Sequence, residues 1–357
     1  MNILINGVGG PTPRSIARSL KHHSDLTGIH LFGTDINPLA YGLYETSLYE
    51  STRVVPPAGH ADYWAVMQAC VEDWKIDLAL VQPELEVLAW AKKKEQDGLP
   101  CKALLPQHHL AVLLTDKARM TDALEGSGMA PPSLVINPDT TDFSAPGDAL
   151  GYPYWIRATA GSSGLGSLKV ENEAALQQWI YINPGVRQFI ASRYLPGRNL
   201  ACKLLYYEGD LVRAACGERV HYIMSKVAPS GITGNTSFGR LLNEPPLVAR
   251  AREAMDQLFT HTQVPKHGFF TVDFKEDEDG VPFITEVNVR HVAFSVCFAA
   301  AGANFSADTV RLLTGDAQMK RDFQEYHFDE PWVFLRDVDA EPVLMPEYRL
   351  MQNQTTV

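Results

Sequence analysis

The sequence predicts a doubly wound parallel α/β domain at the N-terminus, followed by a longer region of hairpins and single helices. Short apolar strands alternate with helical segments up to Pro106, a pattern typical of parallel sheets with helices on both faces. From His109 onward the character changes, and turns rich in glycine, serine or acidic residues separate pairs of strands. The length of 357 residues allows two or three domains.

The elements of the N-terminal region follow from short-range residue patterns. The helix at 62–74 is the clearest, because Tyr63, Val66 and Cys70 recur at helical spacing. The apolar run at 76–81 is the buried strand expected after it. In chain order, the expected strands and helices cover residues 2–6, 14–21, 30–34, 52–55, 62–74, 76–81, 84–94 and 103–105.

The turn after the first strand, GVGG at 7–10, has part of a dinucleotide-binding fingerprint. That fingerprint needs G-x-G-x-x-G and an acidic residue near the end of the next strand, where Asp35 stands. Thr12 occupies the place of the third glycine, and prolines flank it. A tight structural turn is therefore favoured over a pyrophosphate site. The candidates for a ligand site at this carboxyl edge of the sheet are Asp35, Asn37, Glu84 and Glu86.

The bulk composition excludes several classes of protein. A net charge of −11 and a pI of about 5.5 argue against a protein that binds nucleic-acid backbones. The five cysteines are scattered without C-x-x-C spacing, which indicates reduced thiols and no zinc site. No apolar run reaches the length of a membrane span, and no signal-peptide layout precedes the first strand. We expect a cytoplasmic protein without nucleic-acid or membrane partners.

The second region contains two unusual glycine-rich loops. The loop at 160–167, AGSSGLGS, presents backbone amides and hydroxyls suited to an anion, although a flexible hairpin has the same composition. The loop at 225–240 is long, and loops of this length are usually functional or disordered. The expected elements cover residues 115–124, with Thr115 as a cap, then 134–136, 152–157, 168–170, 173–181, 188–195, 200–207, 211–216, 244–261, 268–274, 281–290, 293–301, 306–313 and 332–335.

Charged residues near these loops and on the hairpin at 268–290 are the strongest chemical signal. Lys117 and Arg157 are cations of the kind that neutralise a polyphosphate. On the hairpin, strand alternation places Glu286, Asn288 and Arg290 on one face. The opposite face carries Phe283, Val287 and Val289 and is expected to face an apolar core.

Asp273 joins the face of Glu286 if the hairpin has a two-residue turn at 278–279 or 279–280. A three-residue loop would move Asp273 to the other face. Two carboxylates and an amide oxygen suit Mg²⁺ bridging phosphates. The alternative is a solvated acidic hairpin, which we expect for the acidic residues 276–278 in either case. From the hairpin alone the two interpretations are evenly balanced.

The order and spacing of these motifs resemble the ATP-grasp superfamily, in its carbamoyl-phosphate-synthetase-like branch. The resemblance covers roughly residues 1–313 and rests on GVGGP with FGTDINP, TDK at 115–117, YPYWIRATAGSSGLGS, RYLPGRNL, FFTVDF and ITEVNVR. It implies an α/β pre-domain at 1–108 and a two-lobed α+β ATP-grasp fold. The small lobe would cover 109–187 and the large lobe 188–315, leaving a tail at 316–357.

The same resemblance implies a role for each candidate residue. Lys117 and Arg157 would bind the phosphates of ATP under a lid formed by Gly161, Ser162, Ser163 and Gly164. Adenine would meet the hinge formed by Ser192, Arg193, Tyr194 and Leu195, with Asn199 at the ribose, where an acidic residue is usual. Asp273, Glu286 and Asn288 would hold Mg²⁺, or Mn²⁺ in its place. Arg290, near the transferred phosphate or the substrate carboxylate, and Lys226 in the long loop are the catalytic candidates.

The implied activity is that of a ligase that joins a carboxylate to an amine. ATP phosphorylates a carboxylate, and an amine then displaces phosphate from the acyl phosphate, a reaction that needs positioning and charge neutralisation more than covalent help. The expected cofactors are ATP and Mg²⁺, and the expected partners are a small carboxylate and amine of amino-acid-like character; a homodimer is left open. The alternatives are a carboxylate kinase that releases an acyl phosphate, an NAD(P)-binding oxidoreductase, and a nucleotide-binding regulator without turnover.

Overall fold

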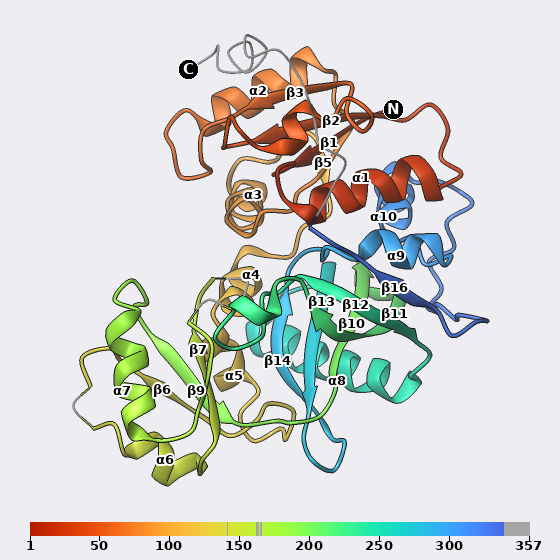
Figure 1. Cartoon of the computed structure of the whole chain (residues 1–357). Helices are drawn as coiled ribbons and strands as arrows, with labels where there is room; N and C mark the ends of the chain where they lie inside the picture. Colours follow the sequence, from red (N-terminus) through yellow and green to blue (C-terminus); the bar gives the residue numbers. More distant parts are fainter. Residues whose placement is uncertain (141, 162–163, 165, 339–357) are drawn as a thin grey trace.

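The computed structural model describes residues 1–140, 142–161, 164 and 166–338. Within these residues the strands form three sheets (Figure 1). The N-terminal sheet lies at the top of the view, and the other two lie below it, side by side. No helix in this described part is both long and apolar enough to cross a membrane.

The N-terminal sheet is parallel throughout and has the strand order β3-β2-β1-β4-β5. Its alternate residues pack on opposite faces: Ile3 and Ile5 belong to the core under α1, whereas Leu4 belongs to the core under α2 and α3. The predicted doubly wound parallel sheet is therefore confirmed. Its elements are β1 (Asn2–Asn6), α1 (Pro11–His23), β2 (His30–Asp35), η1 (Tyr41–Tyr44), β3 (Ser51–Val54), α2 (Tyr63–Asp73), β4 (Leu78–Leu80), α3 (Glu84–Gln96) and β5 (Lys102–Ala103).

Helix α1 begins three residues earlier than the sequence pattern indicated. Pro11 and Pro13 lie in its first turn, where a missing N–H leaves no hydrogen bond unmade and the fixed φ suits a helix. The prolines therefore start the helix.

The second sheet is antiparallel, with the order β6-β9-β7-β8. Residues Tyr154 and Ile156 of β7 form a core with Leu176 of α7 on one face of the sheet. The elements are β6 (Ser133–Ile136), α6 (Ala145–Leu150), β7 (Tyr154–Ala158), β8 (Leu168–Val170), α7 (Glu173–Ile182) and β9 (Phe189–Arg193).

The third sheet has the order β14-β13-β10-β11-β12-β16, with β15 beside β11. Cys202 and Leu204 of β10 face α8, whereas Ala201 and Leu205 face α9 and α10. The elements are β10 (Asn199–Tyr207), β11 (Asp210–Tyr222), η2 (Ser225–Val227), β12 (Thr236–Leu242), α8 (Pro245–Thr262), β13 (Gly268–Glu276), β14 (Pro282–Asn288), α9 (Ser295–Ala300), α10 (Phe305–Thr314), β15 (Gln324–Glu325) and β16 (Val333–Leu335).

Two strands do not follow the expected lobe boundaries at residues 188 and 315. Strand β9 was assigned to the large lobe but pairs with β6 and β7 of the small sheet. Strand β16 was assigned to the tail but pairs with β12 of the large sheet. We therefore propose that the small lobe extends through β9 and the large lobe through β16.

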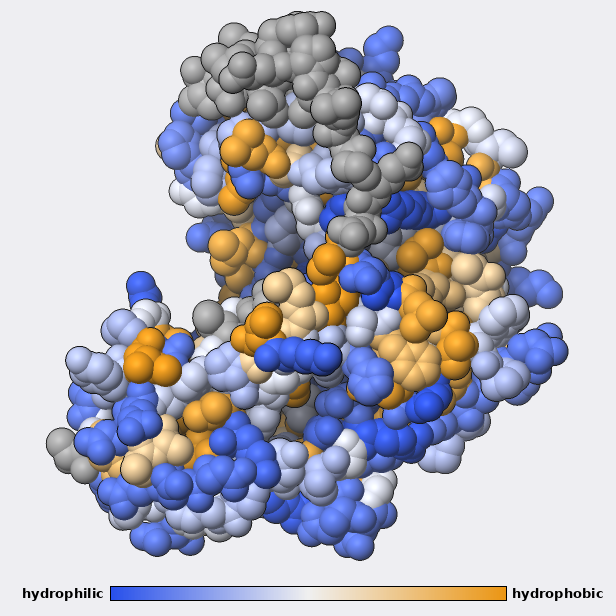
Figure 2. Space-filling model, in the orientation of Figure 1, coloured by the Kyte–Doolittle hydropathy of each residue, from blue (hydrophilic) through white to orange (hydrophobic). Residues whose placement is uncertain are grey.

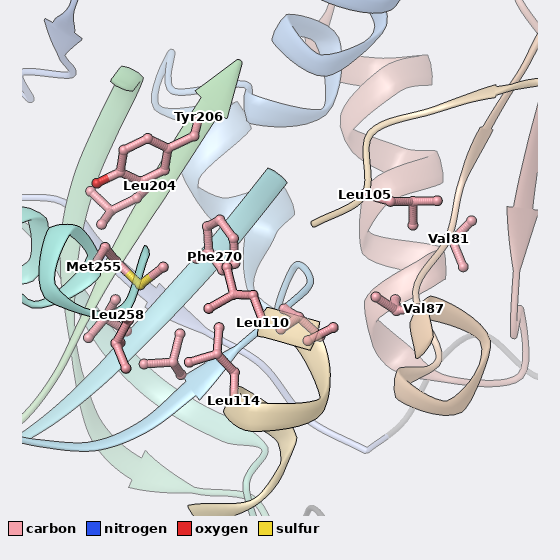
Figure 3. Packing of buried hydrophobic residues seen from close by; sticks show 14 of the residues in the cluster. Val81, Val87, Leu105, Leu110, Leu114, Leu204, Tyr206, Met255, Leu258 and Phe270 are labelled. Carbon is pink, nitrogen blue, oxygen red and sulfur yellow. The ribbon is translucent and has the colours of Figure 1, made fainter. Parts of the chain in front are cut away.

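Helices α4 (His108–Thr115) and α5 (Lys117–Ala123) replace the single helix expected at 115–124. Asp116, and not Thr115, caps α5, because its carboxylate accepts hydrogen bonds from the backbone N–H groups of Ala118 and Arg119. Figure 3 shows Leu110 and Leu114 of α4 between Val81, Val87 and Leu105 on one side and Phe270 and Leu258 on the other. One continuous core therefore joins the N-terminal domain to the large lobe.

A second connection joins the same two parts through α1 and α9, which lie side by side in Figure 1. The Ser15 hydroxyl accepts a hydrogen bond from the backbone N–H of Val296 at 2.7 Å. The Asn304 side chain donates to the carbonyls of Ser19 and His23, both at 2.9 Å. These contacts fix α1 against the face of the large sheet that carries α9.

Candidate functional site

Strands β13 and β14 bring the two candidate metal-binding carboxylates into register. Asp273 pairs with Glu286, but Phe274 pairs with Ile284, so Thr285 is an extra residue in β14. Such a β-bulge shifts the alternation of the strand by one residue. The loop spans residues 277–281, so the two-residue turn on which this inference depended is not formed, and without the bulge Asp273 would oppose Thr285. Asp273 and Glu286 lie on the same face of the sheet, as predicted, but they do so because of the bulge.

The bulge also changes which residues of β14 reach the core. Ile284 and Val287 are buried there, and Val289 follows them. Phe283 is only partly buried, and the guanidinium groups of Arg193 and Arg250 lie over its ring. The prediction that Phe283 faces the core is therefore wrong.

The acidic turn is less solvated than its composition indicated. Glu276 and Asp277 are buried, and the Glu276 carboxylate accepts hydrogen bonds from the guanidinium of Arg198 at 2.9 and 2.7 Å. The Asp277 carboxylate accepts hydrogen bonds from the amides of Asp279 and Val281 at 3.1 and 2.9 Å. These two acids hold the loop together, and Glu278 is exposed as expected.

Asp273 and Glu286 have different electrostatic surroundings. Asp273 accepts hydrogen bonds from Arg219 at 2.6 Å and from the Asn288 amide at 3.0 Å. Burial nevertheless raises the pKa of Asp273, with a contribution from the Glu286 charge. Burial also acts to raise the pKa of Glu286, but Lys117, Arg157 and other cations outweigh it and hold this pKa below its ordinary value. A bound cation would relieve the unfavourable charge on the pair.

The two predicted phosphate-binding cations approach the carboxylates from the small lobe. The ammonium of Lys117 lies 3.7 Å from Glu286 Oε1 and donates a hydrogen bond to the carbonyl of Gly161 at 2.7 Å. Arg157 donates to the carbonyl of the bulged Thr285. The buried Nε atoms of Arg157 and Arg219 have no hydrogen-bond partner among the described residues. An unsatisfied buried donor costs about 1–3 kcal/mol, so these atoms suit an anionic ligand.

The glycine-rich loop contacts the long loop of the large lobe. Gly164 has φ +72°, and a Cβ on it would lie 2.4 Å from the carbonyl oxygen of Ile232. Only glycine permits this conformation and this approach. Ser162 and Ser163, also predicted to cover phosphates, lie outside the described residues.

These residues surround a cavity of about 380 Å³ between the two lobes, a size typical of small-ligand sites. In Figure 2 the surface is hollowed between the small lobe and the N-terminal domain. A larger groove of about 740 Å³ runs along α8, but α8 covers the opposite face of the sheet from Asp273. We assign the site to the smaller cavity. It is lined by Lys117, Trp155, Arg157, Ala158, Gly161, Gly164, Ser167, Ser192, Arg193, Tyr194, Leu195, Asn199, Leu200, Arg219, Tyr222, Ser230, Gly231, Ile232, Gly234, Asp273, Phe274, Lys275, Thr285 and Glu286.

Solved structures share this arrangement of lobes along most of the chain. N5-carboxyaminoimidazole synthetase from Staphylococcus aureus, complexed with ADP, has a TM-score of 0.69 at 17% identity over 94% of this chain and 81% of that one. The chain has the ATP-grasp fold. L-amino acid ligase from Bacillus licheniformis has a TM-score of 0.64 at 13% identity, covering 90% and 77% of the two chains. Comparison with protein-family models and with curated proteins gives no match.

D-alanine–D-alanine ligase from Bacillus anthracis also has a similar structure, with a TM-score of 0.57 at 13% identity. The match covers 88% of this chain and 97% of that one. These structures confirm the predicted ATP-grasp fold, although the sequence identity to each of them is low.

In this ATP-grasp fold the residues of the predicted hinge belong to the cavity wall. Ser192, Arg193, Tyr194 and Leu195 line it, as does Asn199. The side chain of Lys275 donates a hydrogen bond to the carbonyl of Gly197 at 2.5 Å, and Arg198 is paired with Glu276 and Glu244. The chain between β9 and β10 is therefore held in place by ion pairs and hydrogen bonds from the large lobe.

The catalytic candidates lie in different surroundings. Arg290 is partly buried and close enough to Glu286 to lower the pKa of its carboxyl. Lys226 is exposed in η2 and does not line the cavity. Both assignments stay predictions, but only Arg290 is near the carboxylate pair.

Two cavity cations, Arg219 and Lys275, were missing from the sequence-based candidates. The strand containing Arg219 was expected to end at Cys216, whereas β11 continues to Tyr222. The alternation Ala215, Gly217, Arg219 beyond that point was the available signal, since it places Arg219 on the face of Asp273. Lys275 lies two residues after Asp273 in β13, so strand alternation alone places it on the same face.

The N-terminal turn is structural, as the sequence favoured. The amides of Gly7 and Val8 donate to the carbonyl of Thr34, and those of Gly9 and Gly10 donate to Asp35 and to Gly7. All four amides are thus engaged within the fold, and Asp35 is occupied as an internal acceptor, which argues against a dinucleotide.

Of the four residues proposed for the sheet edge, Glu84 is within electrostatic range of Arg290, Glu286 and Lys117. Burial raises the pKa of Glu84, while Arg290 and Lys117 act in the opposite direction. Glu86 instead accepts hydrogen bonds from Asn6 and Tyr63 in the interior, where burial raises its pKa to about 7. Glu86 is therefore a core residue, whereas Glu84 stays a candidate for the site.

Proposed function

We propose that the protein is an ATP-dependent ligase that activates a carboxylate as an acyl phosphate and couples it to an amine, with release of ADP and phosphate. One observation carries the proposal: a single cavity contains three cations, Lys117, Arg157 and Arg219, beside two carboxylates, Asp273 and Glu286. Cations for phosphate oxygens and carboxylates for a divalent ion are both needed for phosphoryl transfer.

The residues present fit Mg²⁺. No group of three His, Cys, Asp or Glu side chains among the described residues could hold a metal alone. Mg²⁺ needs no such group, because it typically uses one or two carboxylates and completes its shell with water and phosphate oxygens. Asp273, Glu286 and Asn288 would hold it, with Arg219 released from Asp273 to a phosphate. Bound Mg²⁺ supplies positive charge to the phosphate oxygens.

The chain's own residues then have distinct tasks. The unpartnered Nε atoms of Arg157 and Arg219 donate to phosphate oxygens, and Lys117 holds the glycine-rich loop over them. Arg290 orients the substrate carboxylate for attack on the γ-phosphate. Glu84 binds the ammonium form of the amine and accepts its proton before the amine attacks the carbonyl carbon. Gly161, Gly164 and Gly166 of the glycine-rich loop, with the loop at 230–234, exclude water, which would hydrolyse the acyl phosphate.

Proteins of similar structure support this choice. Their names include an L-amino acid ligase and a D-alanine–D-alanine ligase, and one is a biotin carboxylase domain dimer complexed with MgADP and bicarbonate. Amino-acid-like substrates, a homodimer and a cytoplasmic location stay predictions for this chain.

The test is release of ADP from ATP, screened against pairs of carboxylates and amines and followed by mass analysis of the products. A ligase requires both partners and forms an amide. A carboxylate kinase would release ADP with the acid alone, and hydroxylamine would trap its acyl phosphate. ATP turnover that depends on no carboxylate would refute the proposal.

A further inference from the structure

Lys203 is a fully buried cation on the same face of the large sheet as Asp273. It lies in β10 two residues after Ala201, which pairs with Asp273, so strand alternation gives the two side chains a common face. The Lys203 ammonium donates a hydrogen bond to the hydroxyl of Ser295 at 2.9 Å. Among the described residues, that hydroxyl is its one hydrogen-bond partner, and no carboxylate lies within 4 Å of it.

The rest of the surroundings of Lys203 are aromatic. Its ammonium lies 4.8, 5.1 and 5.8 Å from the ring centres of Phe298, Phe294 and Phe269. Such rings attract a cation, but burial, together with repulsion from Arg219, lowers the pKa of Lys203 to about 7. An apolar side chain of similar length would fill this space without the cost of burying a charge. Stability alone therefore does not explain why a lysine lies here.

The hydroxyl that Lys203 contacts belongs to the turn between β14 and α9. Ser295 is the first residue of α9, and its hydroxyl donates a hydrogen bond to the carbonyl of Val292 at 2.8 Å. The same hydroxyl lies 3.5 Å from Nδ1 of His291, whose ring stacks on Phe269 with the ring centres 3.8 Å apart. Two adjacent strands, β10 through Lys203 and β13 through Phe269, thus hold this turn against the sheet.

The turn also carries Arg290, which we assign to the substrate carboxylate. The guanidinium of Arg290 donates a hydrogen bond to the carbonyl of His291 at 3.1 Å. The carbonyl of Arg290 accepts a hydrogen bond from the Thr271 hydroxyl at 3.3 Å. A continuous series of contacts therefore leads from Lys203 through Ser295 and His291 to the guanidinium of Arg290.

The far end of the turn is held by the N-terminal domain. The backbone N–H of Val296, the residue after Ser295, donates to the Ser15 hydroxyl of α1 at 2.7 Å. The turn at 290–296 is thus attached to α1 at its end and to the large sheet through Lys203. Removal of the Lys203 hydrogen bond would leave the attachment to α1 in place and free the part of the turn that is nearer to Arg290.

We propose that Lys203 is a positioning residue for the ligase reaction, which sets the orientation of Arg290 through Ser295 and His291. The inference rests on the proposed ligase activity and adds to it a residue outside the cavity. Lys203 lines neither of the two cavities described above, so it acts through the turn and not on the substrate directly. Its charge and its hydrogen bond serve the direction of the Arg290 guanidinium rather than the stability of the fold.

The test combines Lys203→Met with Arg290→Gln in a double-mutant cycle. Methionine fills the space between the rings but cannot donate to Ser295. We expect Lys203→Met to lower kcat/KM for the acid by about tenfold, because a small displacement of a binding group is costly. The KM for ATP should not change, and the melting temperature should equal or exceed that of the wild type. In the Arg290→Gln background the same change should cost less than about twofold, because the group it acts through is gone.

A matched control is Arg213→Met, which removes another buried cation from the large sheet. The guanidinium of Arg213 donates to the carbonyls of Asp322 and Lys320 at 3.0 and 2.9 Å, so its role is structural. This variant should lower the melting temperature and leave the KM for the acid unchanged. Amide hydrogen exchange of residues 290–296, measured without substrate, reports the positioning itself. We expect faster exchange there in Lys203→Met and wild-type exchange in Arg213→Met.

Two results would overturn the positioning role. One is a pair of losses that multiply in the double variant, since Lys203 would then act independently of Arg290. The other is wild-type exchange of residues 290–296 in Lys203→Met. Failure of the ligase is a separate outcome: ATP turnover that depends on no carboxylate refutes the proposed function, and the exchange measurement still decides whether Lys203 holds the turn.

Discussion

Asp273 and Glu286 face each other across β13 and β14 because Thr285 is bulged out of the second strand. The same bulge turns the Thr285 carbonyl towards Arg157, which donates a hydrogen bond to it. One irregularity in a hairpin therefore positions the carboxylate pair and connects it to a cation of the small lobe.

Replacing Glu286 with Gln should remove Mg²⁺-dependent turnover and preserve the fold. The carboxylate would supply charge to a metal, whereas the amide has nearly the same shape. We expect kcat to fall by about 10²–10³, as for other losses of electrostatic stabilisation, at an unchanged melting temperature. The matched control is Glu278→Gln in the exposed turn. Normal Mg²⁺-dependent activity in Glu286→Gln would count against the metal site.

Replacing Gly164 with Ala should impair nucleotide binding. The added Cβ would lie 2.4 Å from the Ile232 carbonyl, at a φ of +72°, so the two loops would be forced apart. We expect the KM for ATP to rise by about tenfold, or by about 1.4 kcal/mol of binding free energy. Gly185→Ala is the control, because a Cβ there meets nothing within 4 Å. Equal ATP kinetics in the two variants would show that the loop contact is dispensable.

Glu86 should make stability depend on pH. Its folded-state pKa is raised to about 7 from an ordinary 4.5, chiefly by burial. The folded protein therefore binds more protons than the unfolded chain between these values, and stability should fall as pH rises from about 4.5 to about 7. The contribution is on the order of 3 kcal/mol.

Denaturant unfolding at pH 5 and pH 8 measures this effect. Glu86→Gln, which mimics the protonated form, should flatten the pH dependence, whereas the exposed Glu72→Gln should leave it as it is. An identical pH dependence in wild type and Glu86→Gln would contradict the assignment.

Leu110 should couple the N-terminal domain to the large lobe. It is fully buried in the core that connects them, so Leu110→Ala should destabilise the protein by about 2–5 kcal/mol. Unfolding of the wild type should be a single transition by both tryptophan fluorescence and circular dichroism. Leu85→Ala, at a position that is 74% exposed, should change stability by less than about 0.5 kcal/mol. Two separate wild-type transitions would show that the connection through α4 is weak.

Sequence patterns were sufficient for much of the fold, and they named many of the residues that the structure brings together in the candidate site. Apolar runs and strand–helix alternation predicted the parallel sheet, because its central strands β1, β2 and β4 are buried along most of their length. Local patterns also placed Lys117, Arg157, Asp273 and Glu286, since strand alternation and loop composition depend on near neighbours. The shared face of Asp273 and Glu286 was predicted through the wrong turn, because a bulge leaves no signal in residue composition.

Features that depend on distant contacts were not predictable in this way. Glu276 is buried because Arg198, 78 positions away in the sequence, neutralises its charge. The composition of the turn alone had indicated that Glu276 is solvated. Strand β16 joins the large sheet through β12 although only a short apolar run marks it.

The most direct test of the ligase follows one oxygen atom. In the proposed reaction, a carboxylate oxygen attacks the γ-phosphate, and amine attack on the carbonyl carbon then expels phosphate with that oxygen. With an acid labelled with ¹⁸O in its carboxylate, the phosphate released in step with amide should therefore carry one ¹⁸O, as measured by mass spectrometry. Unlabelled phosphate from labelled acid would contradict an acyl phosphate and with it the proposed function.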